Sequence, residues 1–292
     1  MSQPIPLSPP AQPTTRAQRA AARSRRRRRS LVVSGISTVV VIGGLATFIL
    51  TSPGWPAVKQ TFFSVSAFTS SFSSVLSGFW LDVKLFLIVE VVVLIVGLLI
   101  ALVRTVRVPA LFPVRMLAIV YVDVMRGVPT ILVVYLIGFG VPALQLKGVP
   151  TGAAVLGGAA LALCYSAYVS EVFRAGIESV HPSQAAAGLA LGLTRWQALR
   201  FVIVPQAVRR VAPPLLNDFI SLQKDVALVS ILGPEEAFRA AQVFAASTFN
   251  YTPLIAAALL YLCVTIPLTR IVDHMQARAM RERGGALALG IR

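Results

Sequence analysis

Charged residues are scarce in this chain. Only 13% of its 292 residues are charged and 56% are hydrophobic, whereas soluble domains carry about 25% charged residues. Acidic residues are the scarcest, with 11 Asp and Glu against 27 Lys and Arg. The low charge and the long apolar runs exclude an ordinary soluble globular protein and predict a protein embedded in a lipid bilayer.

Residues that bind metals or nucleotides are also few. Cys164 and Cys263 stand singly within apolar runs, and His181 and His274 lie far from each other and from cysteine. This spacing predicts no zinc site and no redox pair. The phosphate-binding sequence G-x-x-x-x-G-K-[ST] does not occur. We therefore predict no metal, no cofactor and no covalent catalysis in this chain; if ATP drives it, the ATP and its Mg²⁺ bind another chain.

The basic residues are clustered rather than spread along the sequence. The net charge is +16, and eight arginines lie in the first 29 residues. Most of the others lie between apolar runs, as the positive-inside rule describes. This distribution favours membrane topology and contact with anionic membrane lipid over binding to nucleic acid, which we do not expect as a partner.

The apolar runs predict six membrane-spanning helices. About 20 apolar residues cross the ~30 Å hydrocarbon core of a bilayer. With the N-terminus in the cytoplasm, six spans return the C-terminus to the cytoplasm, and 20 of the 27 Lys and Arg residues then lie in cytoplasmic segments. We therefore predict a multi-pass protein of the plasma (cytoplasmic) membrane. The runs lie at about residues 31–50, 83–103, 116–141, 151–168, 213–232 and 251–271.

The chain divides into five predicted parts. Residues 1–30, rich in Pro and Arg, are predicted to be a disordered, basic cytoplasmic tail. Residues 31–50 are predicted as an uncleaved N-terminal transmembrane helix, because the run is longer than the apolar region of a secretory signal. Residues 51–78 are an extracytoplasmic connector in which an amphipathic surface helix is an alternative. Residues 79–275 hold the other spans, and residues 276–292 form a cytoplasmic C-terminal tail.

A long polar insert interrupts the apolar runs between residues 171 and 205. Pro182 near the start and Gly192 at the end predict a short helix over Gln184–Leu191. Thr194 is predicted to cap a second helix that Pro205 stops. Small side chains on the first helix allow a partner protein to approach closely, so the insert predicts a cytoplasmic docking surface. The alternative is a structured connection without a partner.

The insert resembles the "EAA loop" of permease subunits in ATP-binding-cassette (ABC) importers. The family sequence is E-A-A, three residues, G, nine residues and I-x-L-P, and this chain has Ala186-Ala187-Gly188, Gly192 and Val202-Ile203-Val204-Pro205 at that spacing. Neighbouring segments resemble the polar-amino-acid subfamily, the histidine, glutamine and glutamate type. They are Tyr121-Val122-Asp123 with Arg126-Gly127 and Pro129, Tyr165-Ser166-Ala167-Tyr168 with Glu171 and Arg174, Pro205-Gln206-Ala207, and Leu222-Gln223-Lys224-Asp225.

The resemblance, over about residues 78–275, implies an all-α membrane protein with the type I ABC importer permease fold. It implies a five-helix core, to which the predicted first span is an additional N-terminal transmembrane helix. It also implies a second permease subunit, identical or paralogous, two ABC ATPase subunits and an extracytoplasmic solute-binding protein in a bacterial plasma membrane. The residues expected to couple the chain to the ATPase are Gln184, Ala186, Ala187, Gly188, Gly192, Leu193, Thr194 and Pro205.

The sequence departs from the family pattern at several positions. Ala186 stands where the family has glutamate and Gly188 where it has its second alanine, so we expect Gln184 to replace one polar contact. The usual Lys-Asp-Thr-Ser-Leu is Lys224-Asp225-Val226-Ala227-Leu228, and a familiar threonine early in the first core helix is Asp82. These differences bear on the ligand more than on the fold.

Charged residues inside the predicted spans are candidates for the translocation pathway, because a carboxylate in the bilayer usually faces the protein interior. A zwitterionic amino acid needs both signs of charge: Lys224 for a carboxylate, and Asp225 or Glu90 for an ammonium group. A local structural pair is the alternative role for Lys224 and Asp225. Asp123 and Arg126, at spacing i, i+3, can instead form an ion pair on one helix face. Glu171 and Arg174 are predicted to anchor the loop. The pathway candidates are Glu90, Asp123, Arg126, Asn217, Lys224 and Asp225.

Together these features predict the permease subunit of an ATP-driven importer for a polar amino acid. The cytoplasmic loop helix would couple a separate ATPase to alternating access of the spans. The alternatives are a secondary transporter or channel driven by an ion gradient, with Glu90 and Asp225 as proton carriers, and a non-transporting membrane anchor whose Arg-rich tail recruits a partner.

Overall fold

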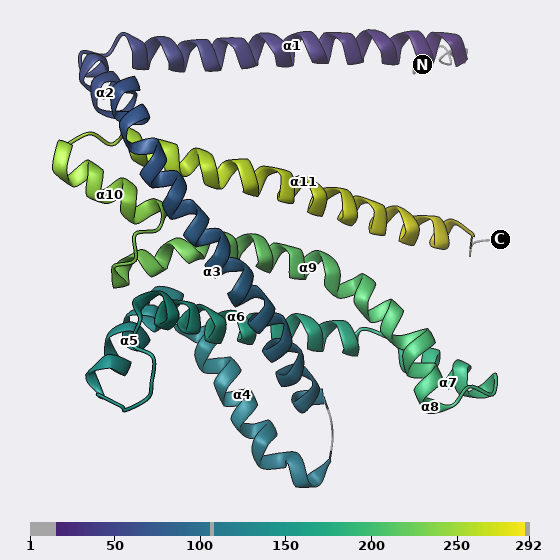
Figure 1. Ribbon diagram of the computed structural model, residues 1–292. Coiled ribbons are helices and arrows are strands. Elements are labelled where there is room, and N and C mark those ends of the chain that lie inside the picture. Colours follow the sequence, from purple (N-terminus) through teal and green to yellow (C-terminus); the bar gives the residue numbers. More distant parts are fainter. Residues whose placement is uncertain (1–15, 106–107, 290–292) are drawn as a thin grey trace, which may run out of the picture. The chain divides into compact units, whose positions relative to one another are not determined.

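The chain folds into helices, with no strand among the residues that the structure describes. The structure is a computed structural model and describes residues 16–105 and 108–289 (Figure 1). Residues 1–60 and 61–292 form two separate units. Each unit is described by itself below.

The N-terminal unit is dominated by one long helix, α1 (Arg16–Leu50). The predicted tail falls partly outside the described residues, at 1–15, and residues 16–30, predicted to be disordered, are helical instead. Ser30–Leu50 is long and apolar enough to cross a membrane, and none of it is buried. The apolar side chains of this segment are therefore available to lipid or to another protein.

The predicted extracytoplasmic connector is largely helical. Helix α2 (Trp55–Phe62) is followed closely by α3 (Val65–Thr105), which continues without a break into the first span of the larger unit. The connector therefore adds helical turns to the beginning of α3. At 41 residues, α3 is longer than the bilayer requires.

The predicted third span is broken into two helices. After the short η1 (Pro109–Leu111), α4 (Phe112–Gly127) and α5 (Thr130–Ala143) meet at an angle of 107°. Val128 is extended and Pro129 precedes the first residue of α5. A residue before proline disfavours the helical conformation, and proline supplies no backbone N–H. The break therefore follows from Gly127-Val128-Pro129.

Helix α6 (Ala153–Glu178) lies at the centre of the larger unit and contacts α3, α4, α5 and α9 (Figure 1). It is the most buried of the helices long enough to span a membrane. Its inward side chains form one core cluster with α3, α5 and α9, which includes Phe86, Val93, Leu161, Val169 and Leu222. Because α6 contacts four other helices, its C-terminal end is a firm support for the segment that follows.

The polar insert contains two short helices, as predicted, but Pro205 does not stop the second. Helix α7 (Pro182–Ala190) is followed by α8 (Arg195–Ala198) and by η2 (Leu199–Ile203), a π-helical turn. The chain then enters α9 (Val204–Asp225) directly, with Pro205 in its first turn. Proline is common in the first turn of a helix, because its fixed φ suits that position.

The last third of the chain completes the fold with two further helices. After α9, η3 (Val226–Leu232) ends at Gly233, which has φ +106°. Helix α10 (Ala237–Thr248) is too short to cross a bilayer, whereas α11 (Thr252–Leu289) contains an apolar segment long enough to do so. The fifth span predicted at 213–232 is not among the described helices that are long and apolar enough to cross a membrane, because α9 carries five charged residues. Helix α9 nevertheless packs against both α6 and α11.

Candidate coupling and translocation site

Helix α7 has well-defined ends that present one face outward. The His181 side chain accepts a hydrogen bond from the Ser183 backbone N–H, and Gly192 closes the segment with φ +86°, a conformation that favours glycine. Gly188 is buried, and a Cβ atom there would lie 3.4 Å from the Ala198 Cβ atom. The glycine face of α7 therefore packs on α8, while Ala186 and Ala187 are exposed.

The exposed face of the insert contains large apolar side chains. Leu191 is 84% exposed, Trp196 67% and Phe201 64%. Thr194 and Gln197 form the predicted cap, in which each side chain accepts a hydrogen bond from the other residue's backbone N–H. Ordered helices that display apolar side chains among basic residues are typical of a protein-binding surface.

A chain of ion pairs holds the C-terminal end of α6. Arg104 on α3 pairs with Glu171, and Arg174 bridges Glu171 at 2.6 Å and Glu178 at 2.7 Å. The Arg104 and Glu171 side chains are largely buried. Glu171 and Arg174 therefore hold the end of α6 just before α7, where the sequence predicts loop anchoring, and Arg104 adds a link to α3.

Helix α9 also contacts the C-terminal end of α6. The Arg210 guanidinium donates to the Ser179 carbonyl, and Gln206 Nε2 donates to Gln184 Oε1 at 3.3 Å. Val211 packs against the backbone of Gly176, where a Cβ atom would clash with it. Helix α9 is therefore linked by side-chain contacts both to the end of α6 and to α7.

Two carboxylates, the buried Glu90 and the partly buried Asp218, lie near each other within the larger unit. Glu90 on α3 is 9% exposed, makes no hydrogen bond within the described residues, and lies close enough to Asp218 on α9 for their charges to interact. One Asp218 oxygen is buried and has no partner. Nearby, the Tyr165 hydroxyl donates to Asp225 at 2.8 Å. Glu90 and Asp225 are thus both internal, whereas Lys224 is exposed and does not pair with Asp225.

The remaining pathway candidates lie on the surface of this subunit. Asp123, Arg126, Asn217 and Lys224 are exposed. Asp123 and Arg126 do not form the expected ion pair; the Arg126 guanidinium lies 5.9 Å from the ring centre of Tyr168 instead. Asn217 and Lys224 are seven residues apart on α9, so they share one helix face. Polar residues on an exposed face of a membrane helix require a polar surrounding, such as a subunit interface or an aqueous path.

A second acidic pair occupies the start of α10. Glu236 accepts hydrogen bonds from the Phe238 and Arg239 backbone N–H groups at 2.7 and 2.6 Å. Asp82 Oδ2 accepts from the Ala237 N–H at 3.3 Å and from the Tyr261 hydroxyl at 2.8 Å. Burial, aided by the charge of Asp82, raises the pKa of Glu236, which lies outside the spanning helices. This arrangement joins α3, α10 and α11.

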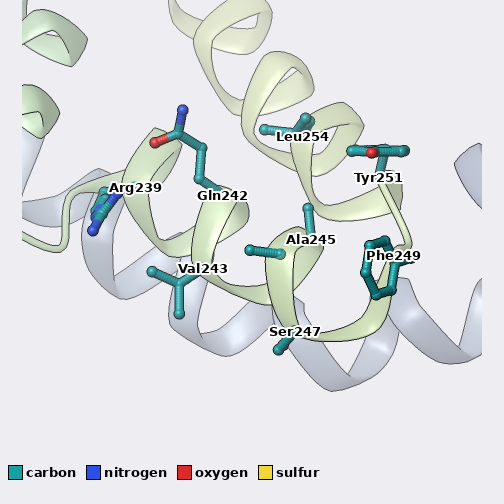
Figure 2. A pocket seen from close by; sticks show the side chains of 9 residues that line it. Arg239, Gln242, Val243, Ala245, Ser247, Phe249, Tyr251 and Leu254 are labelled. Atoms are coloured by element: carbon teal, nitrogen blue, oxygen red, sulfur yellow. The ribbon is translucent and has the colours of Figure 1, made fainter.

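A wide pocket of about 790 Å³ lies where α10 turns into α11 (Figure 2). Its charged side chain is Arg239, and Phe249 at its rim has φ +54°. None of the sequence-predicted pathway residues lines this pocket. The sequence-predicted pathway residues are therefore separate from this opening.

Several residues that make contacts in this region were not predicted as site residues from the sequence. Arg104, Tyr165, Arg210, Asp218 and Glu236 act through partners that lie far away in sequence. Asp218 carried a signal that could have been used, because it is another carboxylate within a predicted span. The role of Tyr165 could not be inferred, since its partner is 60 residues away.

The chain matches a known protein family. Residues 94–281 match the family described as binding-protein-dependent transport system inner membrane component. A probable amino-acid permease protein of Bacillus subtilis, YxeN, is 34% identical over 226 residues, which cover 75% of this chain and 95% of that protein. The glutamine transport system permease protein GlnP of Escherichia coli is 36% identical over 164 residues, covering 55% of this chain and 74% of that protein.

Solved structures resemble the fold as well. A crystal structure of an amino acid ABC transporter with histidines aligns with a TM-score of 0.64 and 33% identity, covering 74% of this chain and 98% of that chain. The MetNI methionine ABC transporter in an inward-facing conformation aligns with a TM-score of 0.54 at 16% identity, covering 70% of this chain and 95% of that chain. The second likeness bears on the fold alone.

Replacing Glu171 with Gln should destabilise the joint formed by Arg104, Glu171 and Arg174 at the C-terminal end of α6. The change leaves Arg104 and part of Arg174 without a carboxylate in a largely buried place, so we expect a loss of about 2 kcal/mol in unfolding free energy. Asp273→Asn is the matched control, because the Arg270–Asp273 pair is 3.7 Å long and exposed; it should cost less than about 0.5 kcal/mol. Equal effects of the two changes on unfolding in detergent would contradict this view of the joint.

Proposed function

The chain belongs to the family of binding-protein-dependent transport system inner membrane components, as a permease subunit of an amino-acid ABC importer, and we propose that a separate ATPase drives it through α7. Its fold is the all-α type I ABC importer permease fold, a five-helix core with one additional N-terminal transmembrane helix. Family membership favours an importer over an ion-gradient-driven transporter or a non-transporting anchor.

The exposed helix α7 is the observation that carries the proposal. It begins and ends at Pro182 and Ala190, and it presents Ala186 and Ala187 to the outside while Gly188 faces inward. Leu191 and Trp196 extend this outer face with exposed apolar surface. A short rod with small side chains and an apolar border fits into a groove of a partner protein.

The joint around α6 explains how movement of α7 would reach the spans. Glu171 and Arg210 connect the end of α6 to α3 and α9 respectively. Inward movement of α7, when two ATPase subunits close on ATP and Mg²⁺, would displace these helices together. The spans would then change from an inward-open to an outward-open arrangement, and hydrolysis would restore the first state. Alternating access of this kind is a two-state equilibrium biased by ligands.

The translocation pathway would lie between two permease subunits. Asn217 and Lys224 share an exposed face of α9, and an exposed ammonium group in a membrane segment is costly unless it faces water or protein. A second subunit, either identical or paralogous, would enclose this face. Lys224 would receive the carboxylate of the substrate, while Asp225 and Glu90 supply negative charge deeper in the protein.

The substrate class follows from the relatives and from these charges. The relatives have names that refer to glutamine, arginine and amino acids generally. Both signs of charge along the proposed pathway suit a zwitterionic, polar amino acid. An extracytoplasmic solute-binding protein would deliver it. The distribution of basic residues supports an orientation in which α7 and both termini lie in the cytoplasm of a bacterial cell.

Gly192→Arg should uncouple ATP hydrolysis from uptake. The added side chain has no clash within this subunit, because nothing lies within 4 Å of a Cβ atom there, but it projects from the proposed docking face. We expect normal insertion in the membrane and uptake reduced by roughly ten-fold. A change of this size lies within the usual range for the coupling between two sites. The measurement is uptake and ATPase activity of the assembled importer in proteoliposomes.

Gly148→Arg is the matched control for this change. Gly148 also has a positive φ, +81°, and open space around it. The substitution therefore introduces the same backbone strain, but in the loop between α5 and α6, which is predicted to be extracytoplasmic. Its uptake should stay within about two-fold of the original. Normal uptake by the Gly192→Arg protein would count against a docked α7.

Lys224→Ala should weaken substrate recognition. Loss of a charged hydrogen bond to the substrate carboxylate should raise the amino-acid concentration for half-maximal uptake by about ten-fold. Lys147→Ala, in the loop between α5 and α6, removes the same charge away from the pathway and should have no effect. If both changes leave uptake kinetics unaltered, Lys224 has a structural role only.

A further inference from the structure

A small cavity beside Asp82 has no role in the mechanism above. Its volume is about 240 Å³, and it lies among α3, α9 and α11. Two polar side chains, Asp82 and Gln223, line it among apolar residues that include three phenylalanines, Phe79, Phe86 and Phe219. The cavity is therefore apolar except for one carboxylate and one amide.

Asp82 is poorly satisfied for a buried carboxylate. It is 3% exposed, and one of its oxygens is held by the Tyr261 hydroxyl and the Ala237 N–H, while Oδ1 is buried without a partner. A buried carboxylate oxygen without a partner carries a large desolvation cost. The side chain lines the cavity, so a donor placed there would satisfy it.

The surroundings of Asp82 lack a neutralising cation. Glu236 adds a second carboxylate at the same helix start, and none of the ion pairs in the described residues involves either acid. Lys84, two residues away, lies over the Trp80 ring instead, and Lys224 lines a separate cavity together with Tyr261. The site therefore favours a positively charged occupant.

The other walls suit an organic cation. Gln223 is 6% exposed and its Oε1 accepts from the Thr265 hydroxyl at 2.9 Å, which leaves one lone pair free. Phenyl rings attract cations through their quadrupole. An ammonium group has three donors and no acceptor, which matches two oxygen acceptors in an aromatic cavity.

We propose that the Asp82 cavity is a binding site for a primary ammonium group, held by the carboxylate of Asp82 and the amide oxygen of Gln223. Asp82 lies about 33 Å along α3 from Arg104, which is close to the full ~30 Å thickness of the hydrocarbon core. The site is thus near the opposite membrane surface from the coupling joint. Its role as a binding site for the incoming amino acid on the translocation pathway rests on the proposed function. Binding of an ammonium group does not depend on that function.

The test uses methylammonium as the probe. The full-length chain is placed in nanodiscs of phosphatidylcholine, which has no primary amine, and equilibrium dialysis at about pH 8, where free carboxylates are ionised, measures binding of radiolabelled methylammonium. We expect saturable binding that weakens by about ten-fold or more in Asp82→Asn, because the charge that attracts the cation is lost. Glu235→Gln, an exposed neighbour of the second acid, should stay within about two-fold.

A second variant keeps the test decisive if Asp82→Asn fails to fold. Val83→Phe fills the cavity without changing any of its polar groups, and it should abolish binding while the hydrogen bonds of Asp82 remain. Absence of saturable binding to the original chain, binding unaffected by either variant, or equal displacement by sodium and by methylammonium would overturn the proposal. In the first case the carboxyl group would simply hold a proton.

Competition identifies the source of the ammonium group. Displacement of methylammonium by lysine or glutamine indicates the transported solute, whereas displacement in nanodiscs containing phosphatidylethanolamine indicates the lipid headgroup; both outcomes support the site. A chain that binds methylammonium but never imports amino acids refutes the proposed function alone. A chain that imports amino acids without binding methylammonium refutes this site alone.

Discussion

Close contact between α3 and α6 is the constraint on which the rest of the structure depends. A Cβ atom at Gly97 would lie 2.8 Å from Val169 Cγ1, and one at Gly158 would lie 2.9 Å from Leu85 Cδ1. Lipid tails are as apolar as leucine, so helices in a bilayer associate through close packing and hydrogen bonds rather than through the hydrophobic effect. Glycines on both helices allow that packing. Because α6 leads directly into the polar insert, its contact with α3 makes the two spans respond together to any force applied at α7.

Charged residues of the larger unit are paired at the end of α6 and unpaired inside the protein. At the end of α6 next to the insert, Arg104, Glu171 and Arg174 satisfy one another, which stiffens the joint. Inside the protein, Glu90 and Asp218 face each other without a cation. Unbalanced carboxylates in a membrane protein are costly and persist where a ligand, a proton or a conformational change uses them. In the proposed function, the joint transmits force and the interior provides the polar surface that a charged solute needs.

Sequence alone predicted the local features of this protein well and the long-range ones poorly. The short helix between Pro182 and Gly192 and the cap at Thr194 are confirmed, with α7 at Pro182–Ala190 where Gln184–Leu191 was predicted. These signals act within a few residues. Pro205 was expected to stop a helix but begins α9, since proline is compatible with a first turn as well as with an end. The break before Pro129 was missed because hydropathy does not record backbone direction.

The roles of the candidate site residues were predicted unevenly for the same reason. Glu171 and Arg174 are three residues apart, so their pairing was accessible from helical spacing. The partner of Asp225 is Tyr165, on another helix, and only the folded chain brings them together. The most direct test of the account is the side of the membrane on which α7 lies. A Ser183→Cys protein without Cys164 and Cys263 should react with a membrane-impermeant maleimide in inside-out vesicles only, and reaction in right-side-out vesicles would contradict the account.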